Sequence, residues 1–143
     1  MTNVLFVDDE ASFLEVIIKR MSKRGITAAG ASNGNEAIGA LERQSFDVVV
    51  LDVKMPGGRN GIEILKEIKT RWPLTEVIML TGHAMLEAAR TGMKTGAFDY
   101  IVKPADFDEL FYKIQDAGQK KMLQESKIKG IDDMMRASKP TKK

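Results

Sequence analysis

The sequence contains no cysteine, one histidine and one tryptophan among its 143 residues. Without cysteine there is no disulfide framework, thiolate metal site or cysteine nucleophile, and the cytoplasm is the expected location. No apolar run approaches the roughly 20 residues that span a bilayer. The N-terminus, MTNVLFVDDE, also lacks the basic start and long apolar core of a signal peptide. We therefore expect neither disulfides nor a membrane segment.

The size and charge of the chain suggest one domain with a short appendage. An apolar content of 43% is enough for a packed core, and the net charge is +2. Residues 1–118 hold 14 Lys and Arg against 17 Asp and Glu, whereas residues 119–143 hold 8 against 3. We expect a domain over 1–118 and a basic helical extension or tail over 119–143, whose charges are solvated rather than bound to nucleic acid or lipid.

Short β-branched apolar runs alternate with amphipathic segments. The runs at 4–7, 48–51, 77–80 and 100–102 lack polar alternation, which predicts strands buried on both faces, and 25–31 is a weaker strand candidate. Apolar residues spaced three and four apart predict the buried faces of helices. These residues are Phe13, Val16, Ile17, Met21, Ala37, Ile38, Leu41, Ile62, Leu65, Ile68, Phe107, Leu110, Phe111 and Ile114.

This alternation predicts an α/β domain, a doubly wound sheet of five parallel strands with helices on both faces. Gly25 is expected to end the first helix and Asn33 to cap the second. Beyond Gly118 the apolar pattern is broken and contains Gly130. An extended last helix and a loosely ordered segment both remain open there.

Polar residues follow four of the predicted strands. Asp8 and Asp9 follow the first, Asp52 the third, Thr81 the fourth and Lys103 the fifth. Each residue alone has an ordinary explanation as a helix cap, a turn or a solvated charge. Because ligands of doubly wound sheets bind beyond the carboxyl ends of the strands, however, the combination indicates one site.

Three neighbouring carboxylates repel one another unless a cation joins them. Oxygen ligands without histidine or cysteine favour Mg²⁺, which takes only one or two protein carboxylates. One carboxylate is then free to attack a phosphoryl group and form an aspartyl phosphate. Lys103 and Thr81 would supply an ammonium and a hydroxyl to the phosphoryl oxygens.

These motifs resemble the receiver domain of bacterial two-component response regulators over about residues 3–118. The matching segments are Val7–Glu10, Leu51–Asp52, Met55–Pro56, Gly61, Leu80–Gly82, Gly96–Tyr100 and Val102–Pro104. The resemblance implies a flavodoxin-like sheet with the strand order 2-1-3-4-5. It also implies a cis peptide bond between Lys103 and Pro104.

The resemblance further implies a role for each site residue. Asp52 is the phosphoacceptor, contacted through its phosphoryl group by Lys103 and Thr81. The Mg²⁺ ligands are Asp8, Asp9, Asp52 and the backbone carbonyl of Lys54.

Three more roles follow from the same likeness. Thr81 and Tyr100 change conformation on phosphorylation, while Lys54 and His83 border the path of attacking water and set the rate of hydrolysis. The loop from Met55 to Gly61 departs from the family in being one residue longer, and its Arg59 is expected to be solvated.

The expected function is a switch that takes a phosphoryl group from a sensor histidine kinase or phosphotransfer protein. The output is a rearranged protein-binding surface near the fourth helix, fifth strand and fifth helix, which acts on a downstream protein or an output domain. A homodimer formed on phosphorylation is also expected, without direct contact to nucleic acid or membrane. Such a chain promotes its own phosphorylation and dephosphorylation and is not an enzyme in the turnover sense.

Other function classes fit less well. A phosphatase of the haloacid dehalogenase kind normally has a second Asp two residues after its nucleophile, where this chain has Lys54. A flavin-binding module would bring a phosphate toward Asp8 and Asp9, which repel it. A DNA-binding regulator would need an output domain, which we do not expect within 143 residues. A module that binds its partner constitutively, without phosphorylation, remains an alternative.

Overall fold

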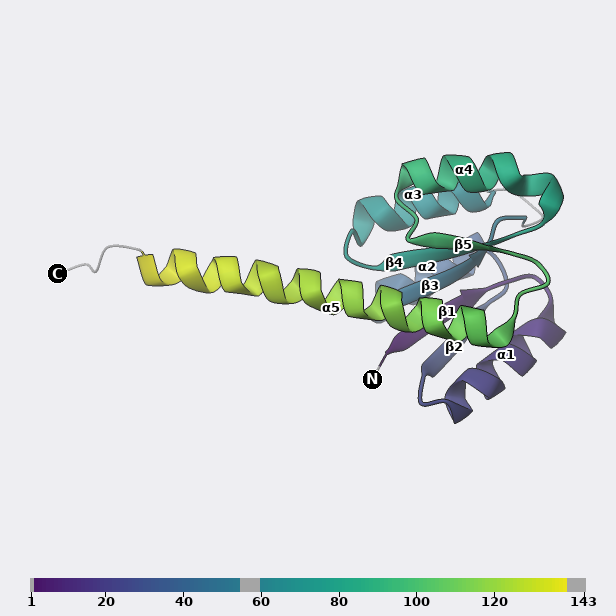
Figure 1. The fold of residues 1–143 in the computed structure, drawn as a ribbon, viewed down its shortest axis with the longest axis horizontal. Helices are drawn as coiled ribbons and strands as arrows, with labels where there is room; N and C mark the ends of the chain where they lie inside the picture. Colours follow the sequence, from purple (N-terminus) through teal and green to yellow (C-terminus); the bar gives the residue numbers. More distant parts are fainter. Residues whose placement is uncertain (1, 55–59, 139–143) are drawn as a thin grey trace.

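The computed structural model describes residues 2–54 and 60–138. In this part of the chain, five strands form one parallel sheet with the order β2-β1-β3-β4-β5. The strands are β1 (Asn3–Val7), β2 (Thr27–Ala31), β3 (Val48–Asp52), β4 (Glu76–Thr81) and β5 (Asp99–Val102). This sheet confirms the predicted α/β class and strand order (Figure 1).

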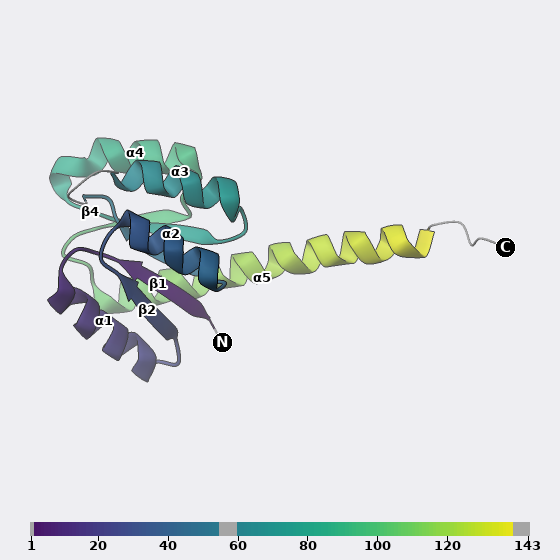
Figure 2. The same cartoon turned by 180° about the vertical axis from the view of Figure 1, so that it is seen from behind.

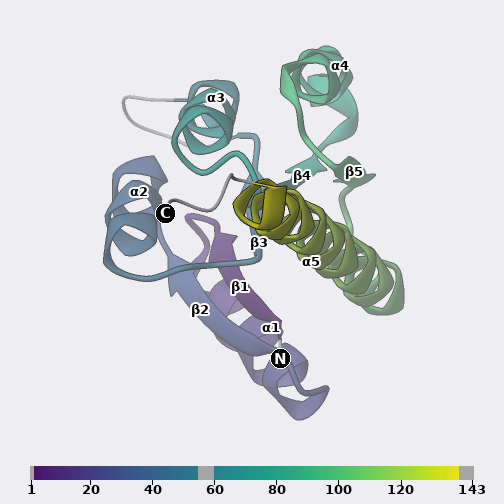
Figure 3. The same cartoon turned by 90° about the vertical axis from the view of Figure 1, so that its left-hand side faces the viewer.

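Helices cover both faces of the sheet. Helices α1 (Ala11–Lys23) and α5 (Phe107–Ser138) pack on one face, and α2 (Gly34–Arg43), α3 (Gly61–Arg71) and α4 (Leu86–Thr95) on the other. A short 3₁₀ turn, η1 (His83–Met85), leads from β4 into α4. Figure 3, viewed nearly along α5, shows the two layers of helices on either side of the sheet.

Alternate residues of the central strands enter the two halves of the core. Leu5 and Val49 pack with α2, α3 and α4, whereas Phe6 and Val50 pack with α1 and α5. All four side chains are at most 1% exposed. The strands therefore present polar groups mainly at their ends, as their unbroken apolar runs predicted.

The helix boundaries follow local signals in the sequence. Gly25, just after α1, has φ +86°, a left-handed conformation that glycine adopts without strain. The side chain of Asn33 accepts a hydrogen bond from the backbone N–H of Glu36 at the start of α2. Asn60 and Glu63 form a capping box at the start of α3. The predicted roles of Gly25 and Asn33 are thus confirmed.

One residue predicted to be buried is not. Val16 is 56% exposed, because the stripe that packs α1 on the sheet is centred on Ile17 and Met21, with Leu14 and Ile18 on the side away from Val16. The other residues of the predicted helix faces are buried or half-buried.

Helix α5 continues well beyond the sheet, as Figures 1 and 2 show. Lys120 pairs with Glu76 at 3.2 Å and Lys121 with Asp47 at 3.1 Å, at the amino-terminal ends of β4 and β3. From residue 122 to residue 138 every side chain except Gln124 is exposed. The extended last helix is therefore the alternative that the structure adopts. Among the described helices, none is both long enough and apolar enough to cross a bilayer.

Substituting Gly61 tests the close approach between α3 and the end of β3. A β-carbon at Gly61 would lie 2.7 Å from the Cα and the carbonyl oxygen of Val53, which are backbone atoms. We predict that Gly61→Ala lowers the free energy of unfolding by about 1–3 kcal/mol, measured by urea denaturation.

The matched control is Gly39→Ala in the interior of α2. Its β-carbon would meet only the flexible side chain of Arg43, at 3.4 Å. Alanine should therefore leave stability unchanged or raise it by about 0.5–1 kcal/mol. Equal destabilisation by both substitutions would contradict the steric explanation.

Candidate functional site

The parallel register aligns the carboxyl ends of four strands at one edge of the sheet. Asp52, the last residue of β3, pairs with Leu80 of β4, and Thr81, the last residue of β4, pairs with Val102 of β5. The polar residues predicted to converge all lie in or just after these strand ends: Asp8, Asp9, Asp52, Thr81 and Lys103.

The carboxylate of Asp52 is buried and held from two sides. Asp52 is only 4% exposed. The Nζ of Lys103 donates to Oδ2 at 2.8 Å, and the backbone N–H of Lys54 donates to Oδ1 at 3.0 Å. Because both oxygens have a donor, the carboxylate has a fixed orientation at the edge of the sheet.

Asp8 lies beside Asp52 and is also buried. Its Oδ1 accepts a hydrogen bond from the backbone N–H of Glu10 at 2.9 Å, and its Oδ2 lies 3.6 Å from the Nζ of Lys103. Burial raises the pKa of Asp8 above its usual value. The Glu10 N–H and Lys103 act in the opposite direction, while the charges of Asp52 and Asp9 raise it further. The net rise in pKa therefore comes mainly from the burial of the Asp8 carboxylate, and the two neighbouring negative charges add to it.

Neighbouring carboxylates also raise the pKa of Lys103. Burial lowers the pKa of its ammonium, but the hydrogen bond and charge of Asp52, together with Asp8, outweigh this effect and leave the pKa raised. Lys103 is the one cation that contacts either carboxylate among the described residues. The lysine is therefore held in its charged form over Asp52.

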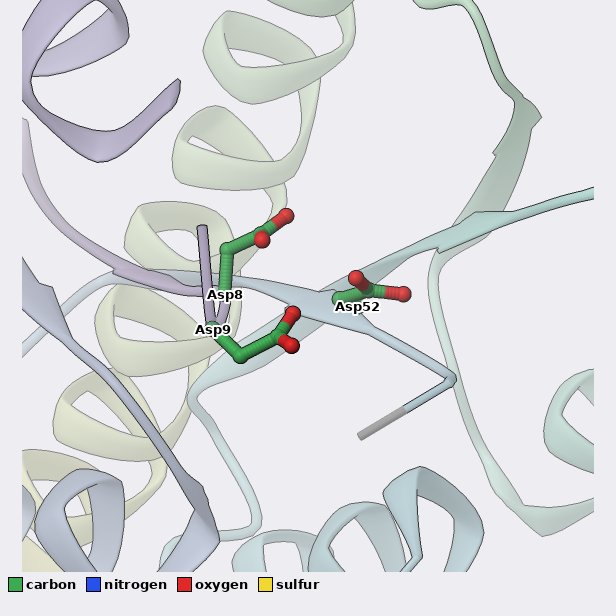
Figure 4. A group of neighbouring side chains, drawn as sticks. All are labelled: Asp8, Asp9 and Asp52. Carbon is green, nitrogen blue, oxygen red and sulfur yellow. The ribbon is translucent and has the colours of Figure 1, made fainter. Parts of the chain in front are cut away.

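The three aspartates form a group able to hold a cation. One carboxylate oxygen from each of Asp8, Asp9 and Asp52 lies within 4.8 Å of the others. Figure 4 shows Asp8 and Asp9 together at the end of β1, with the carboxylate of Asp9 directed toward Asp52. Hard oxygen donors and an excess of negative charge fit a hard divalent cation.

Thr81 is buried at the end of β4, with 1% of its surface exposed. Its hydroxyl lies 3.2 Å from the carbonyl oxygens of Gly82 and Met85, to which it can donate. This contact joins the end of β4 to the start of α4. Sequence reasoning missed Met85 because a backbone acceptor has no side-chain signature.

An open cavity of about 610 Å³ lies over Asp52. Lys54 and His83, the predicted neighbours of the water path, both line it. Glu10 also lines the cavity, although the sequence analysis did not place it in the site. Its position as the third acid in Val7-Asp8-Asp9-Glu10 is the sequence feature that could have indicated this.

The remaining expectations have different outcomes. The Lys103–Pro104 peptide bond is cis, as the resemblance implied. Tyr100 is 40% exposed and is not among the residues that line the cavity over Asp52, so its switching role stays a prediction. The extra loop length between Met55 and Gly61 and the exposure of Arg59 concern residues outside the described part of the chain.

Comparison with known proteins agrees with this geometry. The response regulator receiver domain family matches residues 4–115. The chain is 42% identical over 106 residues to the DNA-binding transcriptional regulator NtrC of Salmonella typhimurium, covering 74% of this chain and 22% of that protein. It is 38% identical over 108 residues to the transcriptional regulatory protein ZraR of Escherichia coli, covering 76% and 24%. The chain thus spans about a quarter or less of the length of these relatives.

Solved structures give the same result. A response regulator receiver domain protein from Clostridium thermocellum superposes with a TM-score of 0.83 at 36% identity, covering 87% of this chain and 99% of that chain. NtrX from Brucella abortus superposes with a TM-score of 0.82 at 30% identity, covering 88% of this chain and 29% of that one. These matches give no support to a phosphatase or a constitutive binding module. The chain belongs to the response regulator receiver domain family, whose members are phosphoacceptors of two-component systems.

Proposed function

We propose that Asp52 accepts a phosphoryl group from the phosphohistidine of a sensor kinase or phosphotransfer protein. The observation that carries this proposal is the setting of Asp52, a buried carboxylate fixed by Lys103 and open to a cavity beside two further aspartates. In the transfer, a carboxylate oxygen of Asp52 forms the new bond to phosphorus as the bond to the histidine nitrogen breaks. Lys103 can then move from the carboxylate to a phosphoryl oxygen.

Asp8, Asp9, Asp52 and the backbone carbonyl of Lys54 would hold Mg²⁺. When bound, the ion would supply positive charge to the phosphoryl oxygens in addition to that of Lys103. Support comes from the grouping of the three carboxylates, whose ligand oxygens lie within 4.8 Å of one another, and from the all-oxygen donor set, which suits Mg²⁺. The chain promotes its own phosphorylation and dephosphorylation and returns to its starting state, so it does not turn over a separate substrate.

Thr81 is the proposed link between the phosphoryl group and the output surface. If its hydroxyl donates to a phosphoryl oxygen, it gives up its contact with the Met85 carbonyl at the start of α4. Tyr100 on β5 then changes rotamer, and the surface of α4, β5 and α5 is altered. A few kcal/mol of bias is enough for such a two-state change.

The output partner is a downstream protein or an output domain, and a phosphorylation-dependent homodimer is a further proposal. The DNA-binding activity in the name of NtrC belongs to a protein of which the matched segment covers only 22%. That residues 1–143 do not themselves contact nucleic acid stays a prediction, as does a cytoplasmic location.

The first test is intact mass after incubation with a small acyl phosphate and Mg²⁺. We predict one phosphoryl adduct on the wild-type chain, lost in Asp52→Asn because an amide is not nucleophilic, and lost when a chelator removes the metal. Asp116→Asn, an exposed aspartate on α5, is the matched control and should be phosphorylated normally. An adduct that persists in Asp52→Asn would refute the assignment.

The second test separates phosphorylation of Asp52 from the conformational change that follows it. Thr81→Ala should still take up phosphate, because Asp52, Lys103 and the metal ligands remain. It should fail to transmit the signal, so that amide NMR shifts across α4 and β5 on phosphorylation are largely lost. Shifts equal to those of the wild type would show that Thr81 does not transmit the phosphorylation signal to α4 and β5.

The third test concerns the lifetime of the phosphoryl group. His83 is exposed and lines the cavity over Asp52, so it partly covers the approach of water. His83→Ala should speed dephosphorylation several-fold, measured by the decay of the adduct. Lys94→Ala, an exposed cation on α4 that is not among the cavity-lining residues, is the control. The proposal fails if the two variants decay at the same rate as the wild type.

A further inference from the structure

Two consecutive lysines of α5 lie where the helix leaves the sheet. Lys120 contacts Glu76 at 3.2 Å, and Lys121 contacts Asp47 at 3.1 Å. Asp47 directly precedes β3, and Glu76 is the first residue of β4. Two neighbouring strands therefore hold the same turn of α5, and we call these four residues the ionic clamp.

The carboxylate of Glu76 depends on α5 for its closer positive charge. Glu76 is 3% exposed. Its Oε2 lies 3.2 Å from the Nζ of Lys120, whereas its Oε1 lies 3.5 Å from the Nζ of Lys69 and has no hydrogen-bond donor in position among the described residues. Lys69 donates to the carbonyl oxygens of Pro73 and Thr75, at 2.8 and 3.0 Å. Moving Lys120 away would therefore leave a buried carboxylate poorly compensated, which is costly.

Lys121 is held more tightly still. It is 9% exposed, and its Nζ donates to Oδ1 of Asp47 at 3.1 Å and to Oε2 of Glu125 at 3.0 Å. The other oxygen of Asp47 accepts a hydrogen bond from the backbone N–H of Asn3 at 2.8 Å, which fixes this carboxylate to the start of β1. The ammonium of Lys121 cannot turn away without leaving Asp47 uncompensated.

Beyond the clamp, apolar packing does little to fix the direction of α5. Ala117, Gly118 and Lys121 are the last buried residues in the described part of the helix. Further on, Leu74 of the domain and Ile128 of α5 line an open hollow of about 290 Å³, where Ile128 is 45% exposed. Because little apolar surface is buried there, the direction of the helix is set at the clamp.

We infer that the ionic clamp holds residues 122–138 as a rigid arm with one direction relative to the domain, instead of leaving them as a flexible tether. The arm is one helix without proline, continuous with the packed half of α5 (Figures 1 and 2). Helices bend sharply only at features such as proline, glycine–serine pairs or bulges. An arm fixed at its base therefore keeps its direction along its length.

The clamp also ties the arm to the strands that carry the site. Strand β3 begins beside Asp47 and ends at Asp52, and β4 begins at Glu76 and ends at Thr81. Any partner bound to the arm is thus held at a set distance and angle from the edge that contains Asp52. The clamp lies at the opposite ends of these strands, so its failure would leave the proposed phosphoacceptor function intact.

Pulsed electron spin resonance on the full chain tests the direction of the arm. Because the chain has no cysteine, spin labels can be attached through Met134→Cys on the arm, combined with Lys19→Cys on α1 or Lys66→Cys on α3, all at exposed positions. Helices α1 and α3 cover opposite faces of the sheet, so the two distances together report one direction. Measured in an excess of unlabelled chain, each pair should give one narrow distance distribution.

The clamp is tested by Lys120→Met combined with Lys121→Met, which removes both charges but keeps long apolar side chains and good helix formers. We predict that the narrow distances are replaced by broad distributions. Amide hydrogen exchange over residues 119–125 should become at least about 10-fold faster. Asp47→Asn combined with Glu76→Gln removes the same two ion pairs from the strand side and should have the same effect.

The matched control is Lys127→Met combined with Lys129→Met, the same chemical change at exposed positions further along the arm, which should keep the narrow distances. Amide exchange in β3 equal to that of the wild type shows that a variant is folded. Lys120→Met alone, at a side chain that is 49% exposed, should broaden the distributions even if the double variant does not fold. The inference is overturned by broad distributions in the wild type, by narrow ones in the folded clamp variants, or by equal broadening in the control.

Discussion

The excess of negative charge around Asp52 is the constraint that organises this molecule. Asp8 and Asp9 follow β1, and Asp52 ends the neighbouring strand β3. Lys103, which follows β5, supplies one compensating positive charge. Buried carboxylates normally oppose folding, and the raised pKa of Asp8 reflects that cost. The burial of apolar side chains on both faces of the central strands stabilises the fold and offsets this cost. The same imbalance gives the edge affinity for a divalent cation and for the phosphoryl group that such a cation accompanies.

The elements around this edge differ in how firmly they are held. Strands β3 and β4 are buried throughout and β1 is buried from Val4 to Val7, whereas α4 buries only Ala89 and Gly92. Gly92 lies so close to Met79 that a β-carbon there would collide with its side chain, so α4 rests on the sheet through small residues. Helices with few large apolar anchors open or shift at low energetic cost. A rigid acceptor beside a lightly anchored α4, joined to β4 through Thr81 and Met85, is the arrangement that a switch requires.

The sequence predicted the sheet and the convergence of the five polar residues because both depend on local patterns. Unbroken apolar runs identify strands buried on both faces, and residues that end parallel strands must meet at one edge. Helix α4 was not predicted from an apolar pattern, since its contacts use alanine and glycine. Val16 was misplaced because spacing alone does not locate the centre of a buried stripe. The Thr81–Met85 contact and the path of α5 past the sheet depend on backbone positions and tertiary ion pairs, which residue types do not encode.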